Sequence, residues 1–444
     1  MGEGIFFSKL SRYTMIMPQT IRETLVREAL FSTHQWRISE KPFYLPPQLQ
    51  QEIESLGRIL LQFYRAINLL YSQSVAGKMP HWIAELMDYG KPSWLVELQR
   101  HRLFKNALPK VIRPDLLLTS DGLRLTELDS VPGGIGILAA LQKIYLGESA
   151  MQKGFASIFE PNATVKIVVS EESASYRSEM EYLARELGAD RFQVVDEYHT
   201  DFPDGCSVYR FFELFDLPNI PCARNLFERA LKKEITITPP PKPVLEEKLW
   251  LALLWNRTLR DFWRQELGNH FYEKMLKLVP RTWILNPEPL PYHAEHPELG
   301  IHDWSELAEF SQSERELVIK VSGFSENAWG SRGVWVGSDL PKKEWAHIVE
   351  ESLEQFSTSP RLLMRFANSK TIPASWYDFD TGTTREMNAR VRLCPYYFVQ
   401  GEQQTQARAL HHGTLATLCA DDKKLIHGMS EAILLPAVSY SQAE

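Results

Sequence analysis

Residues 111–136 have the sequence VIRPDLLLTSDGLRLTELDSVPGGIG, in which two apolar runs flank a Ser-Asp-Gly turn signal. This pattern predicts a β-hairpin. Glu127 and Asp129 are two residues apart on its second strand, so their side chains project from the same face. Asp115, at the start of the partner strand, lies near them if the hairpin is in register. Three converging carboxylates either raise their pKa values or hold a cation, and Mg²⁺ that also binds phosphates prefers oxygen ligands of this kind. We therefore expect the functional site at this hairpin.

A second segment indicates phosphate binding. Residues 318–334, VIKVSGFSENAWGSRGV, begin as a strand that ends in a lysine, continue as a loop with three glycines and return as a strand. Glycines allow backbone N–H groups to close over phosphate oxygens, and Lys320 can neutralise those oxygens. The loop is not a Walker A motif, because no Lys-Ser or Lys-Thr pair follows its glycines at the required spacing. The loop residues that we expect to contact phosphate are Ser322, Gly323, Gly330 and Gly333.

Each segment also has a purely structural interpretation. The three acids could form the solvated edge of a hairpin, because most Asp and Glu side chains are exposed. The glycine segment could be a long β-hairpin with a solvated tip. We favour a metal site at the acids because the phosphate-type loop supports it independently.

Composition excludes several classes of protein. A length of 444 residues allows two or three subdomains around a large core, and 44% hydrophobic residues are ordinary for a soluble globular protein. A net charge of −7 without a basic stripe argues against nucleic acid as a partner. The longest apolar runs, such as Leu249–Trp255, are too short to span a bilayer, and the N-terminus lacks the pattern of a signal peptide. Four widely spaced cysteines indicate reduced thiols in a cytoplasmic protein.

The chain divides into five segments that differ in their hydrophobic pattern. They are a mostly helical N-terminal region (1–110), the acid hairpin with its glycine turn (111–160), a Rossmann-like α/β unit (161–238), a helical segment (244–310), and a final region of strands and glycine turns that includes the phosphate loop (311–444). The Rossmann-like unit lacks the G-x-G-x-x-G turn of a dinucleotide site.

Apolar spacing predicts particular elements within these segments. We expect helices over Pro47–Leu70 and Leu245–Leu267. We expect two separate strands over Ala389–Leu393 and Tyr396–Val399.

The two functional segments together resemble the ATP-grasp superfamily, specifically the circularly permuted branch that includes glutathionylspermidine synthase. The resemblance rests on Arg113-x-Asp115, eleven intervening residues and Glu127-x-Asp129, where the family has R-x-D and then E-x-N before a small-residue turn. It implies an α+β or α/β protein with an ATP-grasp fold, in which two α+β subdomains grip ATP, beside the Rossmann-like unit and the helical N-terminal region. It also implies Mg²⁺ bound by Asp115, Glu127 and Asp129, with Arg113 as the catalytic residue that steadies a phosphorylated carboxylate.

The resemblance extends to two more places, with departures from the family pattern. Asn256-Arg257 resembles the family's N-K pair, whose lysine contacts ATP, and residues 320–333 resemble its K-P-x-x-G-R-E-G-x-N loop loosely. ATP binding is therefore expected at Arg257, at Lys320 and in the glycine loop. Asp129 replaces the family's asparagine, Arg257 its lysine, and Val321 its proline.

Arginines and histidines supply further candidates. Arg390 and Arg392 are two residues apart on a predicted strand and share a face. They either contact the triphosphate or an acidic substrate, or pair with surface acids, and we assign Arg392 to ATP. His293, His296 and His302 occur in a proline-rich stretch without a helical frame, so we do not expect metal binding there.

These features predict an ATP-dependent carboxylate–amine ligase similar to glutathionylspermidine synthase. Its cofactors would be ATP and Mg²⁺, and its substrates a small-molecule or peptide carboxylate and an amine, joined through an acyl phosphate. Two alternatives remain open: a nucleotide-binding protein without catalysis, and a phosphotransferase without an amine acceptor. We expect neither nucleic acid nor a membrane as a partner, and the sequence does not indicate an oligomeric state.

Overall fold

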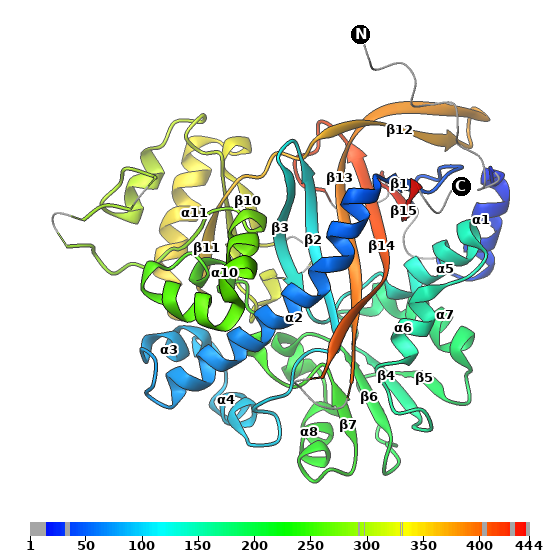
Figure 1. Cartoon of the computed structure of the whole chain (residues 1–444), viewed down its shortest axis with the longest axis horizontal. Helices are drawn as coiled ribbons and strands as arrows, with labels where there is room; N and C mark the ends of the chain where they lie inside the picture. The colour runs from blue at the N-terminus through cyan, green and yellow to red at the C-terminus, as the bar shows by residue number, and fades with distance from the viewer. Residues whose placement is uncertain are drawn as a thin grey trace.

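The computed structural model describes residues 15–31, 36–291, 294–296, 298–328, 330, 332–401, 406–426 and 431–440. These residues form a mixed α+β fold with three β-sheets, which agrees with the predicted class (Figure 1). Within these ranges, no helix combines the length and the apolar character needed to cross a bilayer.

The largest sheet has seven strands and carries the acid hairpin. Its order is β1-β15-β14-β13-β2-β3, and β12 pairs with the first half of the long strand β13, from Thr383 to Arg390. The bounds are β1 Phe43–Leu45, β2 Val111–Thr119, β3 Gly122–Asp129, β12 Thr371–Asp378, β13 Thr383–Gln400, β14 Arg408–Ala420 and β15 Ile433–Ser439. The predicted hairpin is confirmed as β2 and β3.

Helix α2 (Pro47–Val75) crosses one face of this sheet diagonally (Figure 1). Its buried stripe, which includes Ile53, Leu60 and Ile67, packs into the main core against the sheet. The helix predicted at Pro47–Leu70 is confirmed and continues for one more turn. The other N-terminal helices are α1 (Pro18–Arg27), α3 (Trp82–Asp88) and α4 (Ser93–Arg100).

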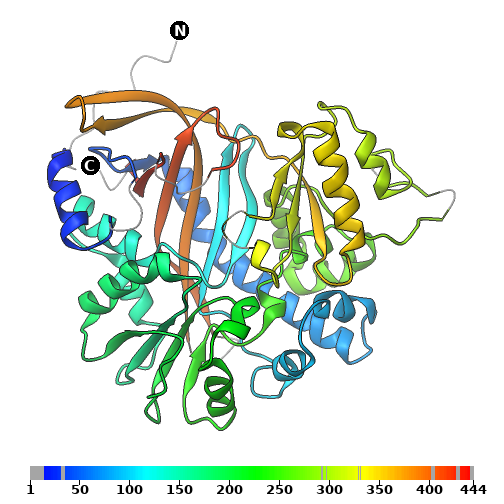
Figure 2. The same cartoon turned by 180° about the vertical axis from the view of Figure 1, so that it is seen from behind.

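A four-stranded sheet beside the hairpin carries the predicted phosphate loop (Figure 2). Its order is β10-β9-β11-β8, with bounds β8 Thr282–Ile284, β9 Leu317–Val321, β10 Val334–Val336 and β11 Arg361–Arg365. Helix α11 (Lys342–Glu354) covers one face, where Trp345 packs against Ile319 and Leu363 in a separate core. The opposite face, which includes Leu362, belongs to the main core.

The third sheet is parallel, as the Rossmann-like pattern predicted. Its order is β5-β4-β6-β7, with bounds β4 Val165–Val169, β5 Phe192–Val195, β6 Ser207–Phe211 and β7 Thr236–Thr238. Helices α7 (Arg177–Leu187) and α8 (Ala223–Leu231) connect its strands. Helices α5 (Ile135–Leu146) and α6 (Ala150–Ala156) join the hairpin to this unit.

Two predictions of secondary structure are wrong. The helix expected over Leu245–Leu267 is interrupted: α9 covers only Trp250–Leu253, and Asn256 caps a 3-10 turn by accepting a hydrogen bond from the Thr258 N–H. Helix α10 (Arg260–Leu278) follows and is kinked at Gly268, whose φ is 72°. The continuous apolar run did not reveal that α9 ends at Leu253 and that Asn256 begins a separate turn as its N-cap.

The second error concerns β13. The strands expected over Ala389–Leu393 and Tyr396–Val399 form one strand, which pairs with β14 from Ala389 to Gln400, with a register shift after Tyr396. On the other side, the ladder with β2 pairs Leu393 with Leu116 and resumes only at Tyr397 with Ile112. Pro395 lacks an N–H donor and lies in this interruption, where no ladder hydrogen bond to β2 is required of it.

The approach of α5 to α7 gives a test of the packing. A Cβ atom on Gly136 would lie 2.0 Å from the backbone oxygen of Glu179, so Gly136→Ala should lower the free energy of unfolding by about 3 kcal/mol or more. Gly77→Ala, at a φ of 70° with open space around it, should cost only about 1 kcal/mol through backbone strain. Urea denaturation of both variants measures the difference, and equal losses would contradict the close packing of these helices.

Candidate active site at the acid hairpin

The hairpin aligns the predicted site residues as cross-strand pairs. Arg113 lies opposite Asp129, and Asp115 opposite Glu127, with an irregularity in register immediately after Asp115. Residues that pair across a ladder and alternate along it share one face of the sheet. The hairpin therefore places one arginine and three carboxylates together on that face.

Arg113 lies between two of these carboxylates. Its Nε is 3.2 Å from Asp115 Oδ1, and its Nη2 is 3.0 Å from Asp129 Oδ2. Its Nη1 donates a hydrogen bond of 3.2 Å to the backbone oxygen of Gly133 in the glycine turn. With 16% of the side chain exposed, this cation joins both hairpin strands to the turn that follows them.

Asp115 is held by β13 as well. Arg392 Nη1 is 2.9 Å from its Oδ2, and Cys394 donates a weak hydrogen bond of 3.4 Å from Sγ to its Oδ1. Burial alone would raise the pKa of Asp115, but the charges of Arg113 and Arg392 outweigh burial and hold the pKa at about 2. The carboxylate is therefore ionised at neutral pH.

These contacts form where β13 and β2 do not pair. The unpaired interval covers residues 394–396 of β13 and 113–115 of β2. Side chains from both strands occupy it, and the Tyr396 hydroxyl donates a hydrogen bond of 2.6 Å to the oxygen of Gly133. The interrupted ladder thus makes room for the buried charges.

Two lysines approach the hairpin from other parts of the fold. Lys320, on β9, donates a hydrogen bond of 2.8 Å to the backbone oxygen of Thr126. Burial lowers the pKa of Lys320 to about 8, although the charge of Glu127 acts in the opposite direction. Lys248, just before α9, lies 3.2 Å from Glu127 Oε1 and also donates to the oxygen of Ala328.

The phosphate loop is only partly open. The hydroxyl of Ser322 and the N–H of Gly323 both donate to the carboxylate of Glu247, the latter at 3.0 Å. Glu247 also pairs with Lys91 at 2.5 Å, with both side chains 1% exposed. Two predicted phosphate donors are therefore occupied by a carboxylate of this chain. Gly330 lines the hairpin cavity, whereas Gly333 lies at the end of the loop and accepts a hydrogen bond from the Val321 N–H.

Glu179, on α7, fixes the glycine turn through hydrogen bonds to the backbone. Its carboxylate accepts hydrogen bonds from the N–H groups of Gly134 at 2.7 Å and Ile137 at 3.0 Å, at the start of α5. Burial raises the pKa of Glu179 to about 7, despite these hydrogen bonds. The amino end of α5 is thus satisfied within the chain.

The resulting cavity has a volume of about 190 Å³. The charged side chains that line it are Arg113, Asp115, Glu127, Asp129, Lys248 and Arg392. Among the described residues, no three His, Cys, Asp or Glu side chains form a group that could hold a metal ion. The physical reason lies in the pairing, because Arg113 lies between Asp115 and Asp129, and Lys248 pairs with Glu127.

The donor chemistry nevertheless fits a metal bound together with phosphates. The carboxylates offer hard oxygen ligands, and each one is balanced here by an arginine or lysine that can bind phosphate instead. Glu127 is the most open of the three, with 31% of its side chain exposed. Phosphate groups that took over the cations would leave the carboxylates available to Mg²⁺.

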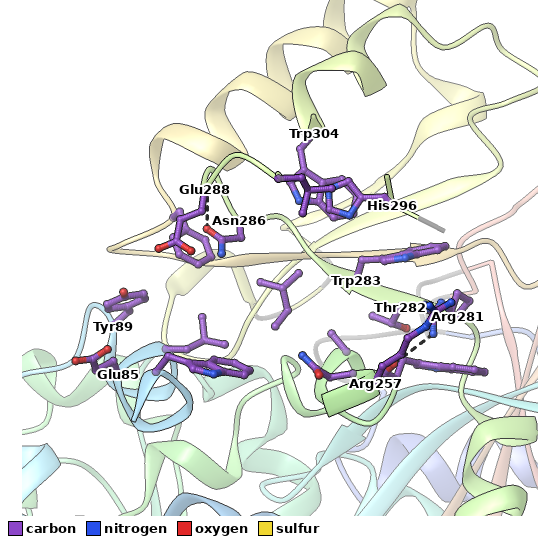
Figure 3. A pocket seen from close by; sticks show the side chains of 18 residues that line it. Glu85, Tyr89, Arg257, Arg281, Thr282, Trp283, Asn286, Glu288, His296 and Trp304 are labelled. Atoms are coloured by element: carbon purple, nitrogen blue, oxygen red, sulfur yellow. Dashed lines mark hydrogen bonds between the residues drawn. The ribbon is translucent and has the colours of Figure 1, made fainter. Parts of the chain in front are cut away.

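Other predicted candidates lie elsewhere. Arg257 is exposed in the 3-10 turn after α9 and lines a different cavity (Figure 3). Arg390, two residues before Arg392, donates to Asn368 and to the backbone oxygen of Ser369, and not to the acids of the hairpin. His293 lies outside the described residues. The ring of His296 packs against that of Trp304, with the ring centroids 3.7 Å apart and the planes tilted by 30°.

Sequence analysis missed Lys248, Glu247 and Glu179. Glu247 and Lys248 precede α9, whose residues are all buried. Charged residues directly before a wholly apolar helix could have marked these two positions as site candidates. Glu179 carried no signal, because it lies on the amphipathic helix α7 like any other acid of that helix.

Comparisons with known proteins bear on the fold. The chain is similar to the apo structure of a glutathione synthetase-like effector from Globodera pallida, with a TM-score of 0.52, 11% sequence identity, and coverage of 96% of this chain and 98% of that chain. A putative gamma-glutamylcysteine synthetase from Methylobacillus flagellatus KT matches at a TM-score of 0.35 and 13% identity over 81% of this chain and 83% of that chain, which is too low to support an argument. No protein-family model and no curated protein matches the sequence. The first likeness shows a shared overall fold.

The pKa of Glu179 predicts a dependence of stability on pH. Because the folded pKa of about 7 exceeds the ordinary value of 4.5, the folded state binds the proton more tightly than the unfolded state. The resulting stabilisation is fully present below pH 4.5 and is lost as pH rises through 7. Relative to Glu179→Gln, the wild-type free energy of unfolding should fall by up to roughly 3 kcal/mol between about pH 5 and pH 8.

Urea denaturation at the two pH values measures this difference. Glu181→Gln is the control, because Glu181 is exposed on the same helix, and this variant should follow the wild type at both values. A constant difference between wild type and Glu179→Gln across this range would show that Glu179 does not change its protonation there.

Proposed function

We propose that this protein is an ATP-dependent ligase that joins a carboxylate to an amine. The observation that supports the proposal most strongly is the meeting of three hairpin carboxylates with Arg113, Lys248, Lys320 and Arg392, at the junction of two β-sheets. The shared fold with a glutathione synthetase-like protein supports the same class of activity. A glutathionylspermidine synthase-like substrate pair is the finer form of this proposal.

In the proposed reaction, the substrate carboxylate attacks the γ-phosphate of ATP and gives an acyl phosphate and ADP. The amine then displaces phosphate and forms the amide. Such chemistry depends on positioning and charge neutralisation more than on a protein nucleophile. Mg²⁺, held by Asp115, Glu127 and Asp129, would neutralise the charge on the phosphates.

The chain's own cations have distinct tasks in this scheme. Lys320 comes from the small sheet (β10-β9-β11-β8) and Lys248 from the segment before α9, and both would neutralise the phosphates from that side. Arg392 would bind phosphate or the substrate carboxylate. Arg113, buried beside Asp115, would stabilise the oxyanion that develops when the amine attacks.

Entry of a whole nucleotide requires the two sheets to separate. The cavity of about 190 Å³ is smaller than the roughly 300–1,000 Å³ of typical small-molecule sites. Two contacts tie the hairpin to other parts of the fold beside this cavity, from Lys320 on β9 to the Thr126 oxygen and from Lys248, just before α9, to Glu127. Both are contacts that phosphate oxygens can replace.

One observation favours nucleotide binding without catalysis. The Glu247 carboxylate accepts hydrogen bonds from Ser322 and Gly323, two predicted phosphate donors. If this contact persists when a nucleotide is bound, the γ-phosphate lacks part of its support. ADP release, measured with and without pools of carboxylates and amines, separates a ligase from a phosphotransferase and from a binding protein.

Glu127→Gln and Asp115→Asn test the metal site. Each change removes a charge from a proposed Mg²⁺ ligand, so Mg²⁺-dependent ADP formation should fall by about 10²-fold or more. Asp121→Asn, in the exposed turn of the same hairpin, is the matched control and should retain the wild-type rate. Normal turnover with an unchanged Mg²⁺ dependence in both site variants would rule out the assignment.

Arg113→Lys tests the role of the buried arginine. The charge remains, but the two-sided contact with Asp115 and Asp129 is lost, so kcat should fall by about 10²–10³-fold while the Kd for ATP stays near normal. Arg124→Lys, on the same hairpin, controls for the substitution itself. A loss of ATP affinity with unchanged kcat would make Arg113 an ATP ligand instead.

A further inference from the structure

A larger cavity lies apart from the acid hairpin, between α3, the end of α9 and the edge of the small sheet (Figure 3). Its volume is about 560 Å³, within the range typical of small-molecule sites. Aromatic rings dominate its lining, and they belong to Trp82, Tyr89, Trp255, Trp283, Trp304 and Phe356. No residue is shared between this cavity and the lining of the hairpin cavity.

Strand β8 gives this cavity a polar backbone wall. Within the described part of the chain it is an edge strand that pairs with β11 alone, and the bonds from Leu285 N–H to Arg361 and from Arg365 N–H to Arg281 face that neighbour. In an antiparallel ladder the intervening residues turn their N–H and C=O groups the other way. Thr282 and Ile284 therefore present backbone donors and acceptors on the cavity side.

One end of the cavity is rich in arginine. An adjoining cavity of about 410 Å³ shares Trp255, Arg257 and Arg281 with it and adds Arg260 and Arg264. The guanidinium of Arg281 lies over the rings of Trp255 and Trp283, at 4.9 Å and 5.4 Å from their centroids. Four arginines against two glutamates in the lining of this adjoining cavity favour an anionic group there.

The opposite end carries hydrogen-bond acceptors. Figure 3 shows Glu85 and Glu288 on the far side of the cavity from Arg257 and Arg281. The acids thus lie at one end of the cavity and the arginines at the other, with aromatic rings in the wall along its length. A matching ligand has a donor group at one end, an anion at the other and a flat ring between them.

An unsatisfied group in the wall supports a ligand independently. The indole Nε1 of Trp283, a residue that is 7% exposed, is buried and has no hydrogen-bond partner among the described residues. A buried donor without an acceptor costs about 1–3 kcal/mol. A ligand acceptor in the cavity would remove that cost.

We propose that this cavity is a second ligand site, for a small molecule with a flat ring, an amino group at one end and a phosphate or carboxylate at the other. The aromatic rings of the lining contact the ligand ring, Arg257 and Arg281 bind its anion, and Glu85 and Glu288 accept from its amino group. An adenine nucleotide and an aromatic amino acid share this chemistry. The site is separate from the hairpin, so it does not depend on the function proposed there.

Calorimetric titration of the full chain without Mg²⁺ tests the proposal, with AMP and 4-aminobenzoate as probes. AMP should bind, whereas adenosine, which lacks the anion, and IMP, which lacks the amino group, should each bind at least about fivefold more weakly. Tighter binding of AMP than of 4-aminobenzoate identifies a nucleotide as the source of the anion, and the reverse order identifies an aromatic acid. Absence of binding by both probes up to about 10 mM overturns the proposal.

Variants locate the binding. Arg257→Glu and Arg281→Ala should each weaken the better probe by about tenfold or more. The first change is at an exposed residue, so its effect does not depend on the fold tolerating a buried substitution. Arg224→Ala is the matched control, because Arg224 also lies over a tryptophan ring, Trp94 at 5.2 Å, but outside both cavities.

A variant of the hairpin tests whether the probe binds at the other cavity instead. Asp115→Asn should leave binding of the better probe unchanged, because Asp115 lines only the other cavity. Binding that disappears in Asp115→Asn and persists in Arg257→Glu places the probe at the hairpin and contradicts the second site.

Discussion

The buried guanidinium of Arg113 is the constraint on which the candidate site depends. It contacts Asp115 on β2, Asp129 on β3 and the backbone of Gly133, so one cation fixes both strands and the turn into α5. Two acids in this position without a counterion would repel each other and favour protonation. Burial of such a group is costly, and a purely structural pairing gains little over an apolar core. The cluster is therefore better explained by chemistry than by stability.

The same cluster determines how the sheets meet. The ladder between β13 and β2 opens over three residues, and the space is filled by charged and polar side chains of both strands. Lys320 from the small sheet and Lys248 from the segment before α9 contact the neighbouring strand β3, at Thr126 and Glu127, so each joins the hairpin to another part of the fold. Phosphates that bound these cations would alter how the two sheets are joined, and this links ligand binding to sheet separation.

Features of the fold that depend on local sequence were predictable, and those that depend on distant contacts were not. The hairpin and the parallel βαβ unit could be predicted from short runs of apolar or alternating residues that are bounded by turn residues. The helix prediction at Leu245–Leu267 failed because apolar periodicity does not show where an N-cap asparagine begins a separate turn. The prediction at Pro395 failed because the proline lies in a gap in the ladder that only the partner strand reveals. At the site, the register of the acids was predictable, but the pairing of Glu127 with Lys248 was not, because it joins residues far apart in the chain.

The order of strands in the large sheet has a consequence for synthesis of the chain. Strand β2 ends at Thr119, and its neighbour β13 begins at Thr383, so the ribosome adds roughly 260 residues before the hairpin can find that partner. At about 5–20 residues per second this takes roughly 13–50 s. Throughout this interval β2 has an open edge, a feature that favours pairing with other nascent chains. Arg113 and Asp115 point from that strand, and their charges oppose such pairing until Arg392 arrives to complete the cluster.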